Sequence, residues 1–137
     1  ELDYISLSIW GGFEAGPAGL NQSYGQLFKE VVGDQTQIIV VGSIFTEEDA
    51  QKAVSEHTDL IAIGRGTLID PLFGQKIKDG RGKSIVSEIS PEQVPATSWT
   101  SGLHEAFTRE DSLGLPKLPG QESMLHLHQG IYDPAEH

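Results

Sequence analysis

The sequence contains no cysteine, which excludes disulfide bonds, thiolate metal sites and a cysteine nucleophile. Basic residues are also scarce: nine lysines and arginines stand against 20 aspartates and glutamates, giving a formal net charge of −11. Nucleic acids and anionic membrane surfaces bind clustered cations, so neither is an expected partner. No apolar run approaches the roughly 20 residues of a membrane span, and no segment resembles a signal peptide. The default expectation is a cytoplasmic protein.

Methionine occurs once, at position 124, and the chain opens directly in a strand-like segment over residues 3–9. An independently translated protein starts with methionine and usually has a few frayed residues before its first buried strand. We therefore expect this chain to be a piece of a longer polypeptide. Its 137 residues, 37% of them hydrophobic, are enough to build one core.

Three hydrophobic segments predict a parallel sheet. Residues 38–41 and 60–63 are continuous β-branched and aliphatic runs, a pattern typical of strands covered on both faces. Between the strands, Ser23 and Thr46 are candidate N-caps of two helices. The residues expected to bury against the sheet are Leu27, Phe28, Val31 and Val32 in the first helix and Ala50, Ala53 and Val54 in the second.

The remainder of the chain is less regular. Pro71 is suited to open a third helix at its first position. From residue 83 onward the periodicity fades, prolines interrupt the chain, and only residues 103–109 favour a helix. Leu72, Phe73 and Ile77 are expected to face inward from the third helix, and Trp99, Phe107 and Tyr132 to pack the tail onto the body. The sequence thus predicts an α/β unit over residues 1–83 and an irregular extension over residues 84–137.

Two glycine-bearing turns follow neighbouring strands of this βαβ unit. Gly42-Ser43 follows the run at 38–41, and Gly64-Arg65 follows the run at 60–63. The C-terminal ends of parallel strands meet at one edge of a sheet, so both turns would direct backbone N–H groups into one small space. Arg65 can add a bidentate contact to phosphate oxygens. The alternative is that the glycines only make tight turns and that Arg65 is a surface residue.

The loop over residues 10–19 is rich in glycine and carries two aromatic residues, Trp10 and Phe13. It leaves the sheet at the same edge as the two glycine-bearing turns, so both rings are candidates to line the mouth of a substrate site. Equally, they can cover the core or contact a neighbouring subunit. A metal site built from His104, His126 and His128 is disfavoured, because leucines interleave with the last two and spacing fixes no third ligand.

Two segments of the chain, residues 38–54 and 59–77, carry a family resemblance. Their sequences are IIVVGSIFTEEDAQKAV and DLIAIGRGTLIDPLFGQKI. They resemble the C-terminal part of the old yellow enzyme family, the FMN-dependent NAD(P)H:flavin oxidoreductases or ene-reductases. The similar stretch runs from about residue 3 to residue 80. Its most specific part is Gly64, Arg65, Asp70, Pro71 and Phe73.

The resemblance implies a TIM (β/α)8 barrel, of which residues 1–83 would form units six to eight. It further implies that Gly42, Ser43, Gly64 and Arg65 hold the FMN phosphate. Members of the family commonly have Gly-Gly or Gly-Asn where this chain has Gly42-Ser43. The family's catalytic residues lie in earlier units, so no catalytic residue is expected here. NAD(P)H would reduce the flavin of the full-length enzyme, which would pass a hydride to a small-molecule acceptor.

The chain alone is therefore expected to be inactive, and to associate with the missing N-terminal part of the barrel or with copies of itself. Two other interpretations remain open. One is a different phosphate-binding TIM-barrel enzyme, and the other is a non-catalytic half-barrel assembly module.

Overall fold

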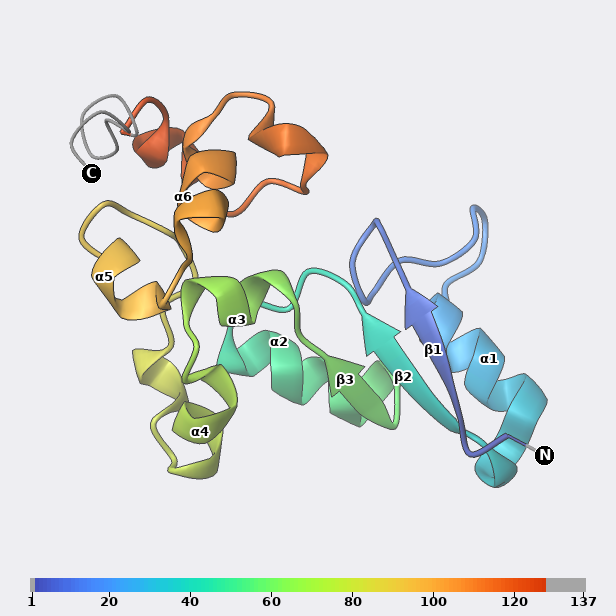
Figure 1. The fold of residues 1–137 in the computed structure, drawn as a ribbon. Helices are drawn as coiled ribbons and strands as arrows, with labels where there is room; N and C mark the ends of the chain where they lie inside the picture. Colours follow the sequence, from blue (N-terminus) through green and yellow to red (C-terminus); the bar gives the residue numbers. More distant parts are fainter. Residues whose placement is uncertain (1, 128–137) are drawn as a thin grey trace.

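The computed structural model of the chain describes residues 2–127. Three strands form one parallel sheet in the order β1-β2-β3, with β2 in the centre (Figure 1). The strands are β1 (Tyr4–Ser8), β2 (Gln37–Val41) and β3 (Leu60–Ala62). Ser8 pairs with Val41, and Val41 pairs with Ala62, so the C-terminal ends of the three strands lie side by side. The chain is thus a mixed α/β unit with a small parallel sheet, as expected.

Helix α1 (Tyr24–Val32) connects β1 to β2, and α2 (Glu47–Lys52) with a π turn at 53–57 connects β2 to β3. Both predicted N-caps are confirmed. Ser23 Oγ accepts a hydrogen bond from the backbone of Gln26 at 3.3 Å, and Thr46 Oγ1 accepts one from the backbone of Asp49 at 3.0 Å. In each case the third residue bonds back to the cap, which completes a capping box.

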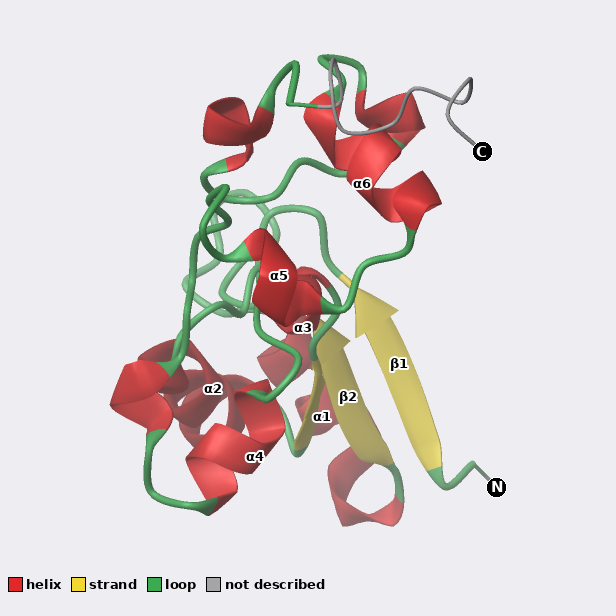
Figure 2. Ribbon diagram, turned by 60° about the vertical axis from the view of Figure 1, so that its left-hand side comes forward, coloured by secondary structure: helices red, strands yellow, loops and turns green. Residues whose placement is uncertain are grey.

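The two helices cover one face of the sheet (Figure 2). Ile38 and Val40 of β2 are fully buried on that face, where they join a core of Phe13, Ile44, Ala50, Ala53 and Phe73. Alternate residues of a strand point to opposite faces. On the other face Ile39 and Val41 are only half-buried, and Ser6 and Ser8 are exposed. The expectation that these strands are covered on both faces is therefore not met within residues 2–127.

Four apolar residues predicted to face inward are exposed instead. The first of them, Phe28 of α1, is 41% exposed. Val31 is 86% exposed on the outer side of α1. Val54 is exposed because the helix widens into a π turn after Lys52, and this changes which side chains face the sheet. Leu72 is exposed because Asp70 closes a turn there, accepting hydrogen bonds from the backbones of Leu72 and Phe73. The third helix consequently begins at Phe73 rather than at Pro71.

The chain after β3 consists of short helices and turns. The helices are α3 (Arg65–Ile69), α4 (Phe73–Lys78), α5 (Val94–Thr97) and α6 (Ser101–Thr108). The 3-10 turns of this part of the chain cover 82–84, 112–114 and 121–124. We call residues 2–83 the sheet unit and residues 84–127 the tail. The helix predicted near 103–109 is confirmed as α6. Helix α5 was not predicted, because it has four residues and includes Pro95.

A second core joins the tail to α3. It consists of Ile69, Ile89, Phe107, Leu118 and Met124. Trp99 packs against this cluster, and its indole N–H donates to the Leu68 carbonyl at 2.8 Å. The predicted anchoring by Trp99 and Phe107 is therefore confirmed, whereas Tyr132 lies outside the described residues. Helix α3 begins beside the sheet edge and ends in the second core.

Asp70, directly after α3, forms a further link between the tail and the sheet unit. Its buried carboxylate accepts hydrogen bonds from the backbone of Val86 at 2.9 Å, from that of Leu72 at 3.1 Å and from Lys76 Nζ at 2.5 Å. Lys76 also donates to the carbonyl of Ser84 at 2.9 Å. Burial raises the pKa of the Asp70 carboxyl, but these hydrogen bonds outweigh burial and hold the pKa below its ordinary value.

None of the helices within residues 2–127 combines the length and the apolar character needed to cross a membrane.

Candidate functional site

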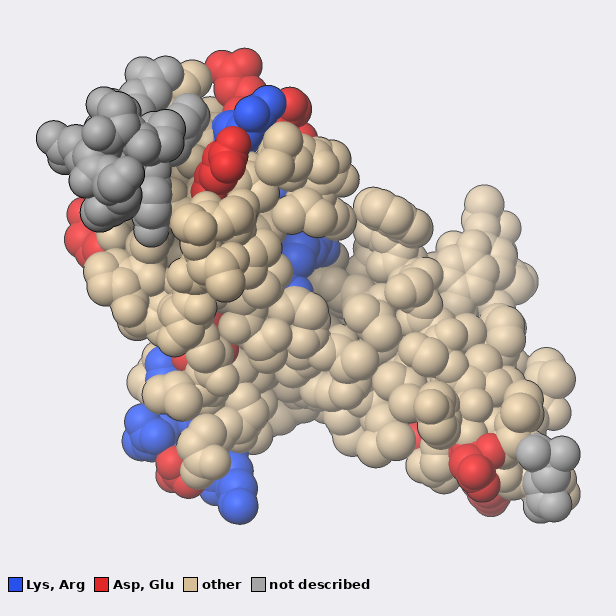
Figure 3. Space-filling view, viewed as in Figure 1, with Lys and Arg blue, Asp and Glu red and all other residues tan. Residues whose placement is uncertain are grey.

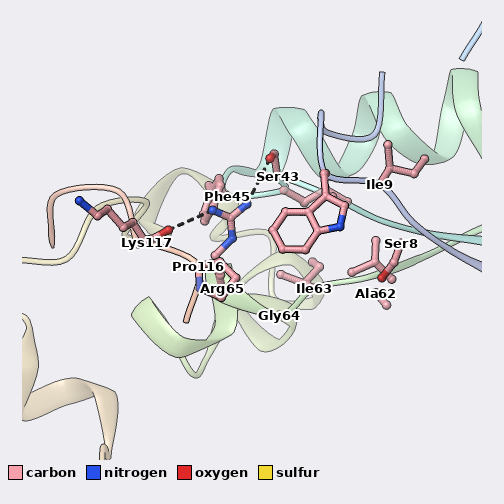
Figure 4. A pocket seen from close by; sticks show the side chains of 14 residues that line it. Ser8, Ile9, Ser43, Phe45, Ala62, Ile63, Gly64, Arg65, Pro116 and Lys117 are labelled. Carbon is pink, nitrogen blue, oxygen red and sulfur yellow. Dashed lines mark hydrogen bonds between the residues drawn. The ribbon is translucent and has the colours of Figure 1, made fainter. Parts of the chain in front are cut away.

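A hollow of about 430 Å³ lies at the edge of the sheet where the strands end (Figure 4). The four residues predicted to hold a phosphate, namely Gly42, Ser43, Gly64 and Arg65, all line it. The structure therefore brings the two glycine-bearing turns together. The other residues lining the hollow are Ser8, Ile9, Trp10, Val41, Ile44, Phe45, Ala62, Ile63, Pro116 and Lys117.

Two glycines allow the loops around the hollow to approach one another. A Cβ atom on Gly42 would lie 2.7 Å from the carbonyl oxygen of Ile9, which belongs to the loop after β1. A Cβ atom on Gly66 would lie 2.7 Å from the carbonyl oxygen of Ile44, which belongs to the loop after β2. Real side chains do not tolerate such distances, so the close contact of the three loops depends on glycine at both positions.

The backbone N–H groups of the two turns have no partner in the described part of the chain. Those of Gly42, Ser43 and Gly64 donate no hydrogen bond to another residue within 2–127. In contrast, the N–H groups of Phe45 and Thr46, just beyond the first turn, both donate to the carboxylate of Asp49. The turns thus keep donors free to bind an acceptor at the hollow.

Arg65 is fixed on several sides. Its Nη1 donates to the carbonyl of Lys117 at 3.0 Å, and its Nη2 donates to Ser43 Oγ at 3.3 Å. The guanidinium carbon also lies 5.1 Å from the centroid of the Phe45 ring, at cation–π distance. A guanidinium has further N–H groups, which remain available to an anion.

The residues that line the hollow include basic side chains and no carboxylate. Arg65 and Lys117 line the hollow, and no aspartate or glutamate is among the lining residues. Elsewhere in residues 2–127, five basic residues form ion pairs with carboxylates, namely Lys29, Lys52, Lys76, Arg81 and Arg109. Figure 3 shows basic atoms in the depression between the sheet unit and the tail, surrounded by uncharged atoms. In a chain with a net charge of −11, the lining of this hollow differs in charge from the rest of the chain.

The two aromatic residues of the loop at 10–19 are placed differently. Trp10 lines the hollow and is 90% exposed. Phe13 is only 5% exposed, belongs to the first core and contacts the His57 ring edge-on at a centroid distance of 5.5 Å. Phe13 does not line the hollow, and its ring belongs to the core, which is one of the two alternatives that the sequence allowed. Phe13 is therefore no longer a candidate for the substrate mouth.

Among the residues that the sequence did not mark for the site, four shape the surroundings of Arg65 or the contact between the loops. Gly66 and Phe45 lie within the segments already singled out, and the dense glycines there were the available signal. Pro116 and Lys117 lie about 50 residues further along, in a part of the tail without periodicity, and no pattern marks them. For metals, no group of three or more potential ligands occurs in the described residues, and His128 lies outside them.

Ser43 adopts a left-handed backbone conformation with φ of 50°. Glycine and asparagine tolerate this region better than serine does. We therefore expect Ser43→Gly to raise the free energy of unfolding by about 0.5–1 kcal/mol, measured by urea denaturation. The weak hydrogen bond from Arg65 would be lost, so the gain should be smaller than in a Ser43→Asn variant that keeps a side-chain acceptor. A decrease in stability in both variants would contradict the assignment of strain to this residue.

The structure describes an α/β chain with a hollow at the C-terminal ends of its parallel strands, and three known proteins resemble the chain in sequence. The chain is 34% identical over 91 residues to the probable NADH-dependent flavin oxidoreductase YqiG of Bacillus subtilis. It is 30% identical over 100 residues to an uncharacterised oxidoreductase of Streptococcus pyogenes serotype M5. It is also 25% identical over 129 residues to an NADH:fumarate oxidoreductase of Klebsiella pneumoniae.

These matches cover 65%, 69% and 87% of the chain, respectively. The chain spans only 24%, 25% and 14% of the lengths of these relatives. No model of a known protein family matches it. The chain thus corresponds to part of a larger oxidoreductase in each comparison.

Proposed function

We propose that this chain is the C-terminal part of an NADH-dependent flavin oxidoreductase of the old yellow enzyme type, and that its hollow holds the phosphate of FMN. The observation that carries the proposal is the convergence of two turns with free backbone N–H groups and of Arg65 on one hollow without carboxylates. The names of two relatives, which mention NADH and in one case flavin, support the choice of cofactor.

The residues of the hollow fit a phosphate monoester. Such a group is a dianion near neutral pH, and its terminal oxygens accept hydrogen bonds only. The unpartnered N–H groups of Gly42, Ser43 and Gly64 would bind these oxygens, together with the remaining N–H groups of Arg65. No carboxylate lines the hollow itself, which limits the repulsion that a bound dianion would meet.

The uncovered face of the sheet supports a role for this chain within a larger barrel. We propose that residues 1–83 form units six to eight of a TIM (β/α)8 barrel, with residues 84–137 as an extension packed on it. The missing N-terminal units would then cover the exposed face of β1 and β2 and supply the catalytic residues. FMN, when bound, would accept a hydride from NADH and pass it to a small-molecule acceptor. This chain's part would be to anchor the phosphate and to place Trp10 at the mouth.

The proposal is tested by measuring flavin binding to the full-length protein. We expect Arg65→Ala to weaken FMN binding about 100-fold, because charge-assisted hydrogen bonds contribute about 1.5–3 kcal/mol each. Riboflavin, which lacks the phosphate, should bind equally well to both forms. The control is Arg81→Ala, since Arg81 is an exposed residue paired with Asp79 away from the hollow.

Each other outcome contradicts the proposal in a different way. Equal FMN affinity in the wild type and in Arg65→Ala would remove the phosphate from this hollow. Binding of inorganic phosphate without any flavin would favour a different phosphate-binding barrel enzyme. Binding of neither ligand would favour a non-catalytic assembly module.

A further inference from the structure

One wall of the hollow comes from the tail rather than from the sheet unit. Pro116 and Lys117 line the hollow, and the Lys117 carbonyl accepts the 3.0 Å hydrogen bond from Arg65. Figure 4 shows this carbonyl facing the guanidinium, while the lysine side chain extends away from it. The contact that reaches the hollow is therefore made by the backbone of the tail loop at 115–118.

This contact restricts Arg65 before any ligand is present. A free arginine side chain carries about 2 kcal/mol of rotamer entropy that binding must remove. Here the Lys117 carbonyl and Ser43 Oγ hold two edges of the guanidinium, and the Phe45 ring holds its face. An arginine held in this way loses less entropy when it binds an anion, and the anion binds more tightly.

The position of the tail loop is itself set by the second core. Leu118 is buried there, and its N–H donates to Gln121 Oε1 at 2.9 Å. Gln121 Nε2 in turn donates to Ser112 Oγ at 2.5 Å, and both side chains are almost fully buried. A buried polar network of this kind has one preferred arrangement, because each unmade hydrogen bond is costly. The network therefore fixes the loop that fixes Arg65.

We infer that the tail is a functional part of the anion site, with Gln121 acting as a positioning residue for Arg65 through the loop at 115–118. The identity of the anion as the phosphate of FMN rests on the proposed function. The inference assigns a role in cofactor selection to residues that share no element with the sheet and touch no ligand themselves. It also gives a role to the hydrogen bond between Arg65 and the backbone carbonyl of Lys117, which is 52 residues away in the sequence.

The test is the phosphate preference of the full-length protein, defined as the Kd for riboflavin divided by the Kd for FMN. Gln121→Met keeps the side-chain volume and removes both hydrogen bonds. We expect it to lower the phosphate preference about five- to tenfold, with riboflavin affinity unchanged. In an Arg65→Ala background the same substitution should have no further effect on the preference, because its influence passes through Arg65.

Two further variants keep the test decisive if Gln121→Met destabilises the tail. Thr108→Val is the matched control, because Thr108 is a buried polar residue of α6 that donates to the His104 carbonyl and is not part of the loop. It should lower the stability of the tail without changing the phosphate preference. Pro116→Gly loosens the exposed loop and leaves the buried network intact, and it should lower the preference in the same direction as Gln121→Met.

The inference is overturned if Gln121→Met and Pro116→Gly leave the preference unchanged, or if they act equally in the Arg65→Ala background. It is also overturned if either variant strengthens FMN binding, because the loop would then compete with the phosphate for Arg65. A wild-type protein that binds no flavin contradicts the proposed function instead. In that case the same variants are compared by inorganic phosphate binding, and failure of the wild type to bind phosphate as well would overturn both.

Discussion

Replacing Asp70 with alanine is expected to lower the free energy of unfolding by about 3–5 kcal/mol, the usual result of removing one member of a buried ion pair. Lys76 would be left with no carboxylate partner, and the N–H groups of Leu72 and Val86 would lose their acceptor. Urea denaturation at pH 7 measures the change. Asp79→Ala provides the control, because Asp79 is an exposed residue paired only with its neighbours, and it should change stability little. Equal effects of the two substitutions would show that Asp70 is not a link between tail and sheet.

The same carboxylate makes stability depend on pH in acid. Its folded pKa lies below the ordinary value near 4, so the unfolded chain binds the proton more readily. The stabilisation is therefore complete above that ordinary value, and it is lost as the pH falls through the folded pKa. In Asp70→Asn, which cannot ionise, the decline in stability between about pH 5 and pH 2 should be shallower than in the wild type. A parallel decline in both proteins would assign the acid sensitivity to other groups.

Replacing Phe73 with alanine is expected to cost about 3–5 kcal/mol of stability, since its ring is fully buried in the first core. The ring also lies beneath the start of α3: a Cβ atom on Gly66 would be 3.5 Å from its Cε2. We therefore expect weaker FMN binding as well, because α3 carries Arg65 at its first residue.

Leu72→Ala is the matched control for Phe73→Ala, because the adjacent Leu72 is 55% exposed and its loss should cost less than about 0.5 kcal/mol. Denaturation of both variants beside the wild type measures the difference. A large effect at Leu72 would mean that a surface outside residues 2–127 covers it.

The features that the sequence predicted well are those determined by neighbouring residues. The caps at Ser23 and Thr46 each depend on a residue three positions away, and both capping boxes are present. The meeting of Gly42 with Gly64 depends on one topological rule, that parallel strands joined by a helix end at the same edge. Because that rule holds for nearly every such unit, the hollow could be expected before its shape was known.

The features that the sequence did not predict depend on distant contacts. The inward face of α1 could not be assigned from its apolar residues, because Val31 and Val32 both belong to the apolar pattern, yet Val31 is exposed and Val32 packs against the first core. Phe13 could equally belong to a mouth or to a core while its neighbours in space were unknown. Lys117 contributes a carbonyl, which every residue possesses, so no choice of side chain could mark it.

The order β1-β2-β3 leaves peptide groups along the outer margins of β1 and β3 without a neighbouring strand in the described chain. Tyr4 and Leu60 add exposed apolar surface at those margins. Unprotected margins of this kind recruit further strands, whether from the rest of the same polypeptide or from other molecules. The isolated chain should accordingly be prepared at low concentration, because a high protein concentration would favour intermolecular sheets over the monomer.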